Sequence, residues 1–283
     1  MKKPVCLSSE SSFDLPLALR QELDIHVIPL TIILGEKEEE DGNIPARKIY
    51  DYVEYSGKLA RTAAINTYAY EAYFDSLLEA YEHVIHISLS SRLSATCQNA
   101  ILASQNPKYE GKVTVIDSRS VSSAIGLLAV RCATLAKEGK SVPEILKAYE
   151  SFKNDVHVTF FVEKLEYLAK GGRCSKLALF GANLLKLHPQ IVVKDGALVP
   201  GEKYRGPLSK VVKEYLASVE EEAPSFDPSL AIIAHTVMPE EVLFRVQDRL
   251  YERGFTRVEI VEASGAISCH CGPHAFGVIY FKK

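Results

Sequence analysis

Five hydroxyl side chains gather in residues 86–100, at the point where an apolar strand gives way to a helix. Residues 84–89 predict a buried strand and residues 95–104 predict the following helix. A helix N-terminus carries unpaired N–H groups and a partial positive charge, so this junction predicts a site for a carboxylate or a phosphate. A helix cap needs only one hydroxyl, so capping by one serine does not explain the whole group. The hydroxyls belong to Ser88, Ser90, Ser91, Ser94 and Thr96.

Two further junctions place hydroxyls between a strand and a helix. Residues 4–7 predict a first strand that is followed by a helix, so residues 8–12 put four serines and Glu10 in the turn between them. Ser118 follows the predicted strand at residues 111–117 in the same way. Ligands of open α/β sheets bind outside the carboxyl ends of the strands. The three junctions are therefore expected to share one edge of a sheet.

The order of the elements indicates an α/β protein. Strand and helix alternate through the first half, which is typical of a mostly parallel sheet with helices on both faces. The second half combines strands, helices and a hairpin turn at Asp195-Gly196, which predicts an α+β arrangement. We therefore expect two domains, residues 1–155 and residues 156–283, divided at a polar Asn154-Asp155 turn.

Several segments of the chain carry more specific expectations. Residues 177–187 predict a helix that is apolar on almost every face, so it either belongs to the core or lines an apolar cavity. Residues 165–170 predict a short helix that ends at Gly171-Gly172. Residues 156–162 predict one continuous strand. Two loops are expected, at residues 61–64 and residues 265–277.

One cluster contains potential soft metal ligands, Cys269-His270-Cys271 with His274. The spacing is tighter than that of a zinc ribbon, and adjacent side chains point apart, so no metal site is predicted. His270 is either a neutral hydrogen-bond donor or a loop histidine with its own partner. The six cysteines lie on apolar segments of a large chain, which is typical of reduced, packed thiols.

Composition restricts the class of protein. With 47% hydrophobic and 24% charged residues in 283, the chain can bury a core, and a net charge of −3 offers no basic surface for nucleic acid. The first apolar stretch is too short for a signal peptide, and no apolar run approaches a membrane span, so a cytoplasmic protein is expected. The dinucleotide, phosphate-loop, nucleophile-elbow and zinc-protease motifs are absent.

Several separated segments together resemble the DegV family of fatty-acid-binding proteins, the acyl-carrying subunits of bacterial fatty acid kinase. SSESSFDLP at residues 8–16 resembles the family's opening Asp-Ser-Thr-Ser-Asp-Leu-Pro, with Glu10 where aspartate is usual. SSRLSATCQNA at residues 90–100 resembles Ser-Ser-x-Leu-Ser-Gly-Thr-Tyr-Gln-x-Ala, with Ala95 and Cys97 departing. Shorter pieces follow in the family's order: Asp117-Ser118, LAKGGR at residues 168–173, Asp195-Gly196, Arg205-Gly206 and His270-x-Gly-Pro.

The resemblance implies a two-domain protein that holds one long-chain fatty acid in an apolar tunnel at or near the domain interface, with no cofactor. By position, it implies that Thr62, Ser91, Ser94 and His270 surround the carboxylate. It implies a kinase catalytic subunit as the partner, and two arginines that face this partner or its phosphate, Arg173 and Arg205.

The family pattern is weakest in the loop that contains Thr62. Thr62-Ala63-Ala64-Ile65 stands where the family usually has Thr-Ser-Gln-Pro. One hydroxyl of the implied head-group site is therefore missing, which leaves Thr62 as the only one in that loop. We expect neutral donors around the carboxylate. A close bidentate arginine would stabilise the negative charge and make the carboxylate a weaker nucleophile toward a phosphoryl group.

Two other functions are compatible with the same residues. A small phosphotransferase or hydrolase could use the serine-rich junction as its anion site, and would need His270 as a general base. A lipid-sensing interaction module would bind the same ligand without a kinase. The first function predicts activity of the protein alone, and the second predicts a different partner in a pull-down from cell extract.

Overall fold

The structure is a computed structural model that describes residues 2–174 and 187–283. The first half contains a four-stranded sheet in the order β2-β1-β6-β7. All three of its pairings are parallel, which confirms the prediction for this half. Its strands are β1 (Lys3–Glu10), β2 (Ile25–Ile28), β6 (Tyr81–Ser88) and β7 (Val113–Asp117).

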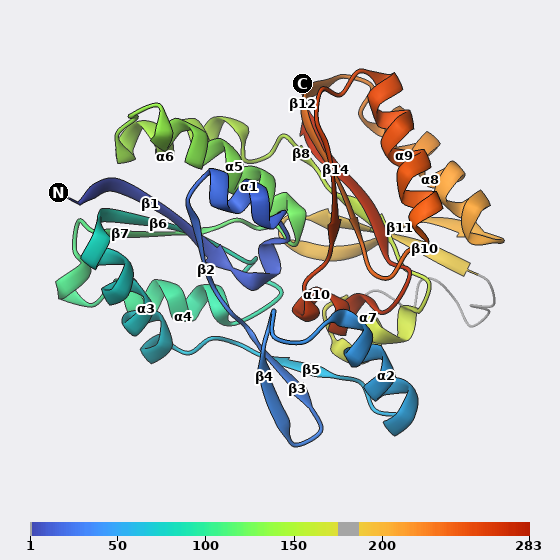
Figure 1. Cartoon of the computed structure of the whole chain (residues 1–283), viewed down its shortest axis with the longest axis horizontal. Coiled ribbons are helices and arrows are strands. Elements are labelled where there is room, and N and C mark those ends of the chain that lie inside the picture. Colours follow the sequence, from blue (N-terminus) through green and yellow to red (C-terminus); the bar gives the residue numbers. More distant parts are fainter. Residues whose placement is uncertain (1, 175–186) are drawn as a thin grey trace.

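Helices cover both faces of this sheet (Figure 1). The most deeply buried is α5 (Ser123–Lys137), whose run of alanine, leucine and isoleucine leaves few polar positions. It packs against β1 and β6 and also against β14 of the second half. The helices on its side are α1 (Leu17–Glu22) and α6 (Val142–Phe152), and those on the other side are α3 (Thr67–Ala80) and α4 (Thr96–Ser104).

A small antiparallel sheet, in the order β4-β3-β5, projects from the first half. It consists of β3 (Thr31–Leu34), β4 (Lys37–Glu40) and β5 (Arg61–Ala63). Helix α2 (Ala46–Ser56) lies between β4 and β5 in the chain. The expected loop at residues 61–64 is therefore wrong for its first three residues. They form a strand because β3 offers them a partner, with Ile32 opposite Thr62, and such a long-range pairing leaves no local signal.

The second half contains a seven-stranded sheet in the order β11-β10-β9-β14-β12-β13, with β8 paired to β14. Only the pairing of β12 with β13 is parallel, so this half is α+β as expected. Residues 156–162 form two short strands rather than one. The strands are β8 (Val156–His157), β9 (Thr159–Phe161), β10 (Leu187–Lys194), β11 (Ala197–Arg205), β12 (Phe226–His235), β13 (Val258–Glu262) and β14 (Phe276–Lys282).

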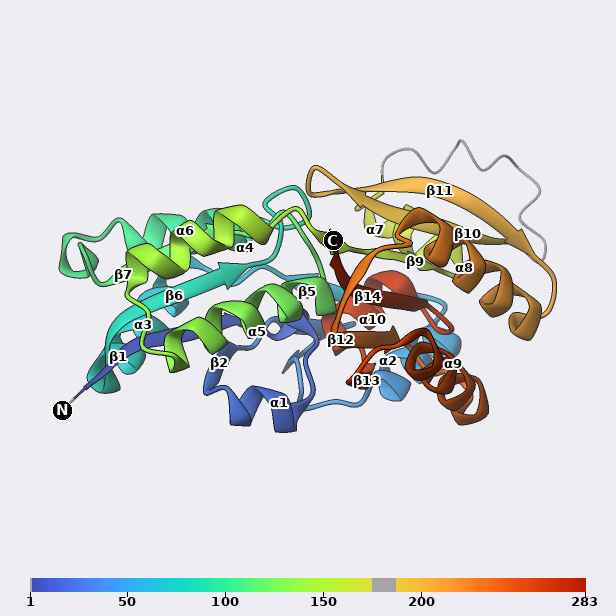
Figure 2. The same ribbon diagram turned by 90° about the horizontal axis from the view of Figure 1, so that it is seen from above.

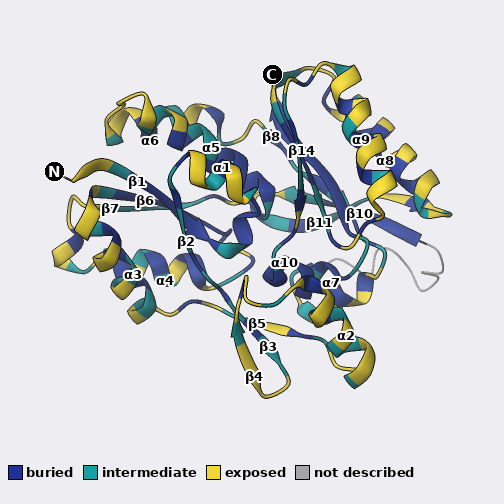
Figure 3. Ribbon diagram, in the orientation of Figure 1, coloured by how far each residue is buried: buried dark blue, intermediate teal, exposed yellow. Residues whose placement is uncertain are grey.

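Helices α8 (Leu208–Glu222) and α9 (Glu240–Arg253) lie together along one side of this sheet (Figure 2). Each is amphipathic, with its apolar residues buried and its charged residues exposed, as the colouring of Figure 3 shows. Two short helices, α7 (Leu165–Gly171) and α10 (Gly265–Cys271), pack against each other near the small sheet. Within residues 2–174 and 187–283, no helix is both long and apolar enough to cross a membrane.

Helix α10 corrects the expected loop at residues 265–277. Ser264 caps it by accepting a hydrogen bond from the Ile267 N–H, and Gly272 ends it with a φ of +71°. The sequence GAISCHC has weak intrinsic helix propensity, so the pattern gave little local indication of a helix. Burial against η1 (Ser11–Phe13), α2, α7 and β3 stabilises it.

The largest hydrophobic core contains residues of both halves. It includes Ile85 and Leu128 from the first half and Ile191, Ile232 and Ile279 from the second. The division at residue 155 stays a prediction. The expected apolar helix at residues 177–187 lies outside the described residues except for Leu187, which begins β10.

Candidate functional site

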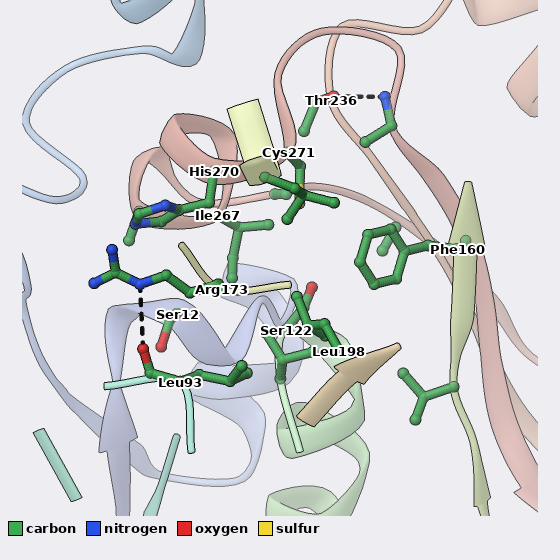
Figure 4. A pocket seen from close by; sticks show the side chains of 18 of the residues that line it. Ser12, Leu93, Ser122, Phe160, Arg173, Leu198, Thr236, Ile267, His270 and Cys271 are labelled. Carbon is green, nitrogen blue, oxygen red and sulfur yellow. Dashed lines mark hydrogen bonds between the residues drawn. The ribbon is translucent and has the colours of Figure 1, made fainter. Parts of the chain in front are cut away.

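A cavity lies where the two halves meet, and its walls come from both of them (Figure 4). The space between its lining atoms amounts to about 940 Å³, including the part that is open to solvent. Most of the lining is apolar and is supplied by segments far apart in the chain. These residues include Leu30, Leu89, Leu93, Val121, Phe160, Leu198, Ala234, Ile267, Phe276 and Ile279.

Polar side chains occupy one part of this wall. The Oγ1 atom of Thr62 and the Nε2 atom of His270 are 3.0 Å apart and are joined by a hydrogen bond. Thr62 is held on β5 by its pairing with β3, and His270 lies on α10, which packs against both strands. Two residues that are 208 positions apart in the sequence thus form one polar pair in the cavity.

Ser94 also lines the cavity, just before α4. Its hydroxyl donates to the Thr96 hydroxyl at 2.9 Å, and it accepts from the Thr96 N–H at 3.2 Å. Ser94 therefore serves the start of the helix and faces the cavity at the same time. The expected helix cap is not formed by Ser94, because Ala95 is the N-cap of α4 and no side chain caps it, and the role of Ser94 toward a ligand stays a prediction.

The other hydroxyls of the junction have partners elsewhere. Ser91 is exposed, is not among the lining residues, and donates to the Asp117 carboxylate at 2.6 Å. Ser90 donates to the carbonyl oxygen of Gly196 at 2.7 Å. The strand ends do meet at one edge, as expected. Most of the hydroxyls there donate hydrogen bonds to carboxylate or carbonyl oxygens of the protein. Ser94 is the one serine of residues 86–100 that lines the cavity.

Glu10 lies at the end of β1 rather than in a turn, and it is fully buried. Its carboxylate accepts hydrogen bonds from the Tyr70 hydroxyl at 2.6 Å, the Ser88 hydroxyl at 2.6 Å and the Leu89 N–H at 2.9 Å. Burial alone would raise the pKa of Glu10, but His86 and these hydroxyls outweigh it and lower the pKa. The ionised carboxylate thereby fixes the end of β6, from which the chain runs to Ser94.

Asp14 connects the two helices that border the cavity. Its carboxylate accepts from the Ser122 hydroxyl at 2.5 Å, where α5 begins, and from the Ser264 N–H at 2.8 Å, where α10 begins. Ser122 itself lines the cavity. Burial raises the pKa of Asp14 to about 7. The position of α10, and hence of His270, therefore depends on a residue near the N-terminus.

Arg173 lines the cavity beside His270 (Figure 4). Its Nε donates to the Leu93 carbonyl at 3.3 Å and its Nη1 donates to the Gly171 carbonyl at 2.6 Å. The sequence predicts only neutral donors around the carboxylate, whereas the structure adds the positively charged Arg173 to the cavity lining. Burial, and then the charge of Arg173, lowers the pKa of His270 to about 4, so the imidazole is neutral at pH 7.

Comparison with known proteins identifies the family. The model described as "Uncharacterised protein, DegV family" matches residues 7–283. This chain belongs to the DegV family. Among DegV relatives, a fatty acid-binding protein of Thermotoga maritima is 29% identical over 275 residues, covering 95% of this chain and 94% of the relative. Protein DegV of Bacillus subtilis is 28% identical over 283 residues, covering 99% of each chain.

Solved structures agree with this assignment. A DegV family protein of Thermus thermophilus, described by its fatty acid binding, has a TM-score of 0.86 at 26% identity and covers 99% of this chain and 100% of its own. The Streptococcus pneumoniae fatty acid kinase B3 protein, loaded with linoleic acid, has a TM-score of 0.84 at 19% identity, covering 99% and 100%, and supports the DegV fold alone. The names of these relatives agree with a lipid-binding protein rather than a catalyst.

Arg205 lies apart from the cavity in this DegV protein. It is exposed at the end of β11, opposite Leu187 of β10, and is not among the lining residues. Its role toward a partner stays a prediction.

Within residues 2–174 and 187–283, no three His, Cys, Asp or Glu side chains are grouped so as to hold a metal ion. Cys269 and Cys271 are buried thiols on α10.

A hydrolase that used the serine-rich junction would require His270 as its general base. A general base works best when its pKa lies near the working pH. The pKa of His270, at about 4, makes it a weak base at neutral pH. The Thr62–His270 pair is therefore better suited to holding a ligand by hydrogen bonds than to activating a nucleophile.

The depressed pKa of His270 predicts how stability varies with pH. The unfolded chain takes up the proton near the ordinary value of 6.5 and the folded protein only near 4, so stability falls as the pH falls from 6.5 to 4. We expect His270→Gln to lack this component, measured by chemical denaturation at several pH values. Asp14 also changes stability with pH, but it is present in both proteins. Its contribution therefore cancels when the free energy of unfolding of the variant is subtracted from that of the wild type. A difference that is constant from pH 7 to pH 4 would contradict the prediction.

Gly171 allows α7 to approach the His270 ring. A Cβ atom at this position would lie 2.9 Å from the Nδ1 atom of His270. We expect Gly171→Ala to displace the ring and weaken ligand binding several-fold, as measured by titration of the lipid-free protein. The matched control is Gly172→Ala. A Cβ atom at position 172 would meet no atom within 4 Å, but the backbone there has a φ of +72°. This control should lose stability and keep its affinity; the reverse pattern would refute the assignment.

Proposed function

We propose that this DegV-family protein binds one long-chain fatty acid in the cavity, with the carboxylate at Thr62, Ser94 and His270 and the tail along the apolar wall. The observation that carries the proposal is a largely apolar cavity whose lining includes the hydrogen-bonded Thr62–His270 pair and Ser94. Relatives named as fatty acid-binding proteins support the choice of ligand. Ser91 is left out of the head-group site because it is exposed and bonded to Asp117.

The tail and the head group of the fatty acid contribute differently to the free energy of binding. Burial of about 14 methylenes at roughly 0.8 kcal/mol each gives about 11 kcal/mol before the costs of binding. A buried carboxylate costs several kcal/mol unless donors satisfy it. The tail therefore supplies affinity, and the polar groups supply orientation. Arg173 adds a positive charge that lowers the cost of bringing the anion into the cavity.

The proposed biological step is presentation of the acid to a separate fatty acid kinase for phospholipid synthesis. A carboxylate oxygen attacks the γ-phosphorus of ATP on the kinase, the bond to the β-phosphate oxygen breaks, and an acyl phosphate and ADP result. The DegV protein provides no phosphate-transfer groups in this step. It exposes the acid and holds the tail. Arg205, exposed at the end of β11, is the proposed contact with the kinase.

Titration of the lipid-free protein with palmitate and with hexadecanol tests the binding function. Both ligands carry the same tail, so a site for an acid group should bind palmitate more tightly. Assay of the same protein for hydrolase and phosphotransferase activity, with His270→Ala as the control, tests the alternative. Absence of palmitate binding, or turnover that depends on His270, would refute the proposal.

A further inference from the structure

The hydroxyl of Ser12 is buried in the wall of the cavity without a partner. Ser12 is 1% exposed, lies in η1 and lines the cavity. Among the residues that the structure describes, none forms a hydrogen bond with its Oγ atom. Its neighbour Ser11 differs in this respect, since it donates to Asp41 at 2.6 Å and accepts from the Leu30 N–H at 3.0 Å.

A buried hydroxyl without a partner destabilises a fold, and most such groups are satisfied by protein or by ordered water. An alanine would fill nearly the same space without this cost. An unpartnered hydroxyl that faces a cavity therefore indicates a group that arrives with a ligand.

The surroundings place Ser12 in the polar part of the cavity. Segment η1 packs against α10, the helix that carries His270. In the view of Figure 4, Ser12 is drawn on the same side of the cavity as Arg173 and Leu93, and Phe160 is drawn on the other side. These neighbours belong to the part of the wall where the proposed function puts the carboxylate.

We propose that Ser12 is a further head-group residue, whose hydroxyl donates a hydrogen bond to the carboxylate of the bound fatty acid. This inference rests on the proposed function. An ionised carboxylate has about four acceptor positions, one more than Thr62, Ser94 and His270 fill with one hydrogen bond each. A fourth contact from η1 would also connect the ligand to Asp14, which follows η1 in the chain, and through Asp14 to the starts of α5 and α10.

Ser12→Ala tests the inference through the choice between two ligands. A hydrogen bond to a charged group is worth about a factor of ten or more in affinity. We expect the variant to bind palmitate about tenfold more weakly and to bind hexadecanol almost as the wild type does. An unchanged affinity for palmitate, or an equal loss for both ligands, would overturn the inference.

Thermal unfolding of the lipid-free proteins gives a second readout. Ser12→Ala should keep or raise the melting temperature, because it removes an unpartnered buried group, while its shift on adding palmitate should shrink. Ser11→Ala, which loses bonds on both sides, should melt lower. If the two variants melt equally low, Ser12 has a structural partner and the inference fails. If the wild type binds neither ligand, the proposed function itself fails.

Discussion

Replacing Ala234 with phenylalanine is expected to weaken the retention of a long-chain fatty acid roughly a hundredfold. Ala234 lies on β12 with its side chain in the cavity lining, among the residues packed against the largest core. A phenyl ring there occupies space that the tail requires. Exclusion of roughly four methylenes at about 0.8 kcal/mol each weakens binding by about 3 kcal/mol, or roughly a hundredfold. Titration of the lipid-free variant with palmitate measures the change.

The control for this experiment is Ala217→Phe on α8. Ala217 is exposed, so the same added ring changes the surface and leaves the cavity untouched. Both variants should fold, because one fills existing space and the other faces solvent. Equal affinities of the Ala234→Phe variant and the wild type would show that the tail lies elsewhere.

Charge reversal of Arg205 is expected to separate binding from phosphorylation. The Arg205 side chain is exposed and outside the cavity, so Arg205→Glu should bind palmitate as the wild type does. Close charge pairs at interfaces are worth about 1.5 kcal/mol or more, so acyl-phosphate formation with the fatty acid kinase of the same organism should fall at least tenfold.

The matched control reverses a charge on a different surface. Arg245 is exposed on α9 and pairs only with Glu241 of the same helix among its described contacts. Arg245→Glu changes the net charge equally and should leave acyl-phosphate formation unchanged. If both variants lose the same activity, the effect comes from net charge, and the specific role of Arg205 is refuted.

The sequence predicted those features that depend on local periodicity. Parallel strands alternating with helices were recognisable because each buried strand ends at a cluster of hydroxyls or a turn signal. The hairpin of β10 and β11 was recognisable from Asp195-Gly196. Thr62, Ser94 and His270 were assigned by resemblance, and all three line the same cavity, although their contact with a ligand stays a prediction.

The remaining features depend on contacts between distant segments. Strand β5 exists because β3 pairs with it, and α10 exists because it is buried on several sides. The separation of Ser91 from Ser94 could not be deduced, because the competing acceptor, Asp117, belongs to another strand. Ser12 stood among the serines of the second junction, but only coordinates distinguish its unpartnered hydroxyl from that of Ser11.

The position of Arg173 bears on the proposed chemistry, because this cation lines the cavity. Within the described ranges, its guanidinium group donates to the carbonyl oxygens of Leu93 and Gly171 and pairs with no carboxylate. Its positive charge therefore remains available to the anion, and it contributes, after burial, to the lowered pKa of His270. The head group is thus expected to meet hydroxyls and a neutral imidazole directly, with one cation close by.

Mass spectrometry of organic extracts from protein purified without added lipid tests the central claim most directly. We expect one long-chain fatty acid per protein molecule in the wild type, and a strongly reduced amount in the Ala234→Phe variant. Wild-type protein that carries no fatty acid, and takes up none when palmitate is supplied, would contradict the assignment of this cavity to a lipid.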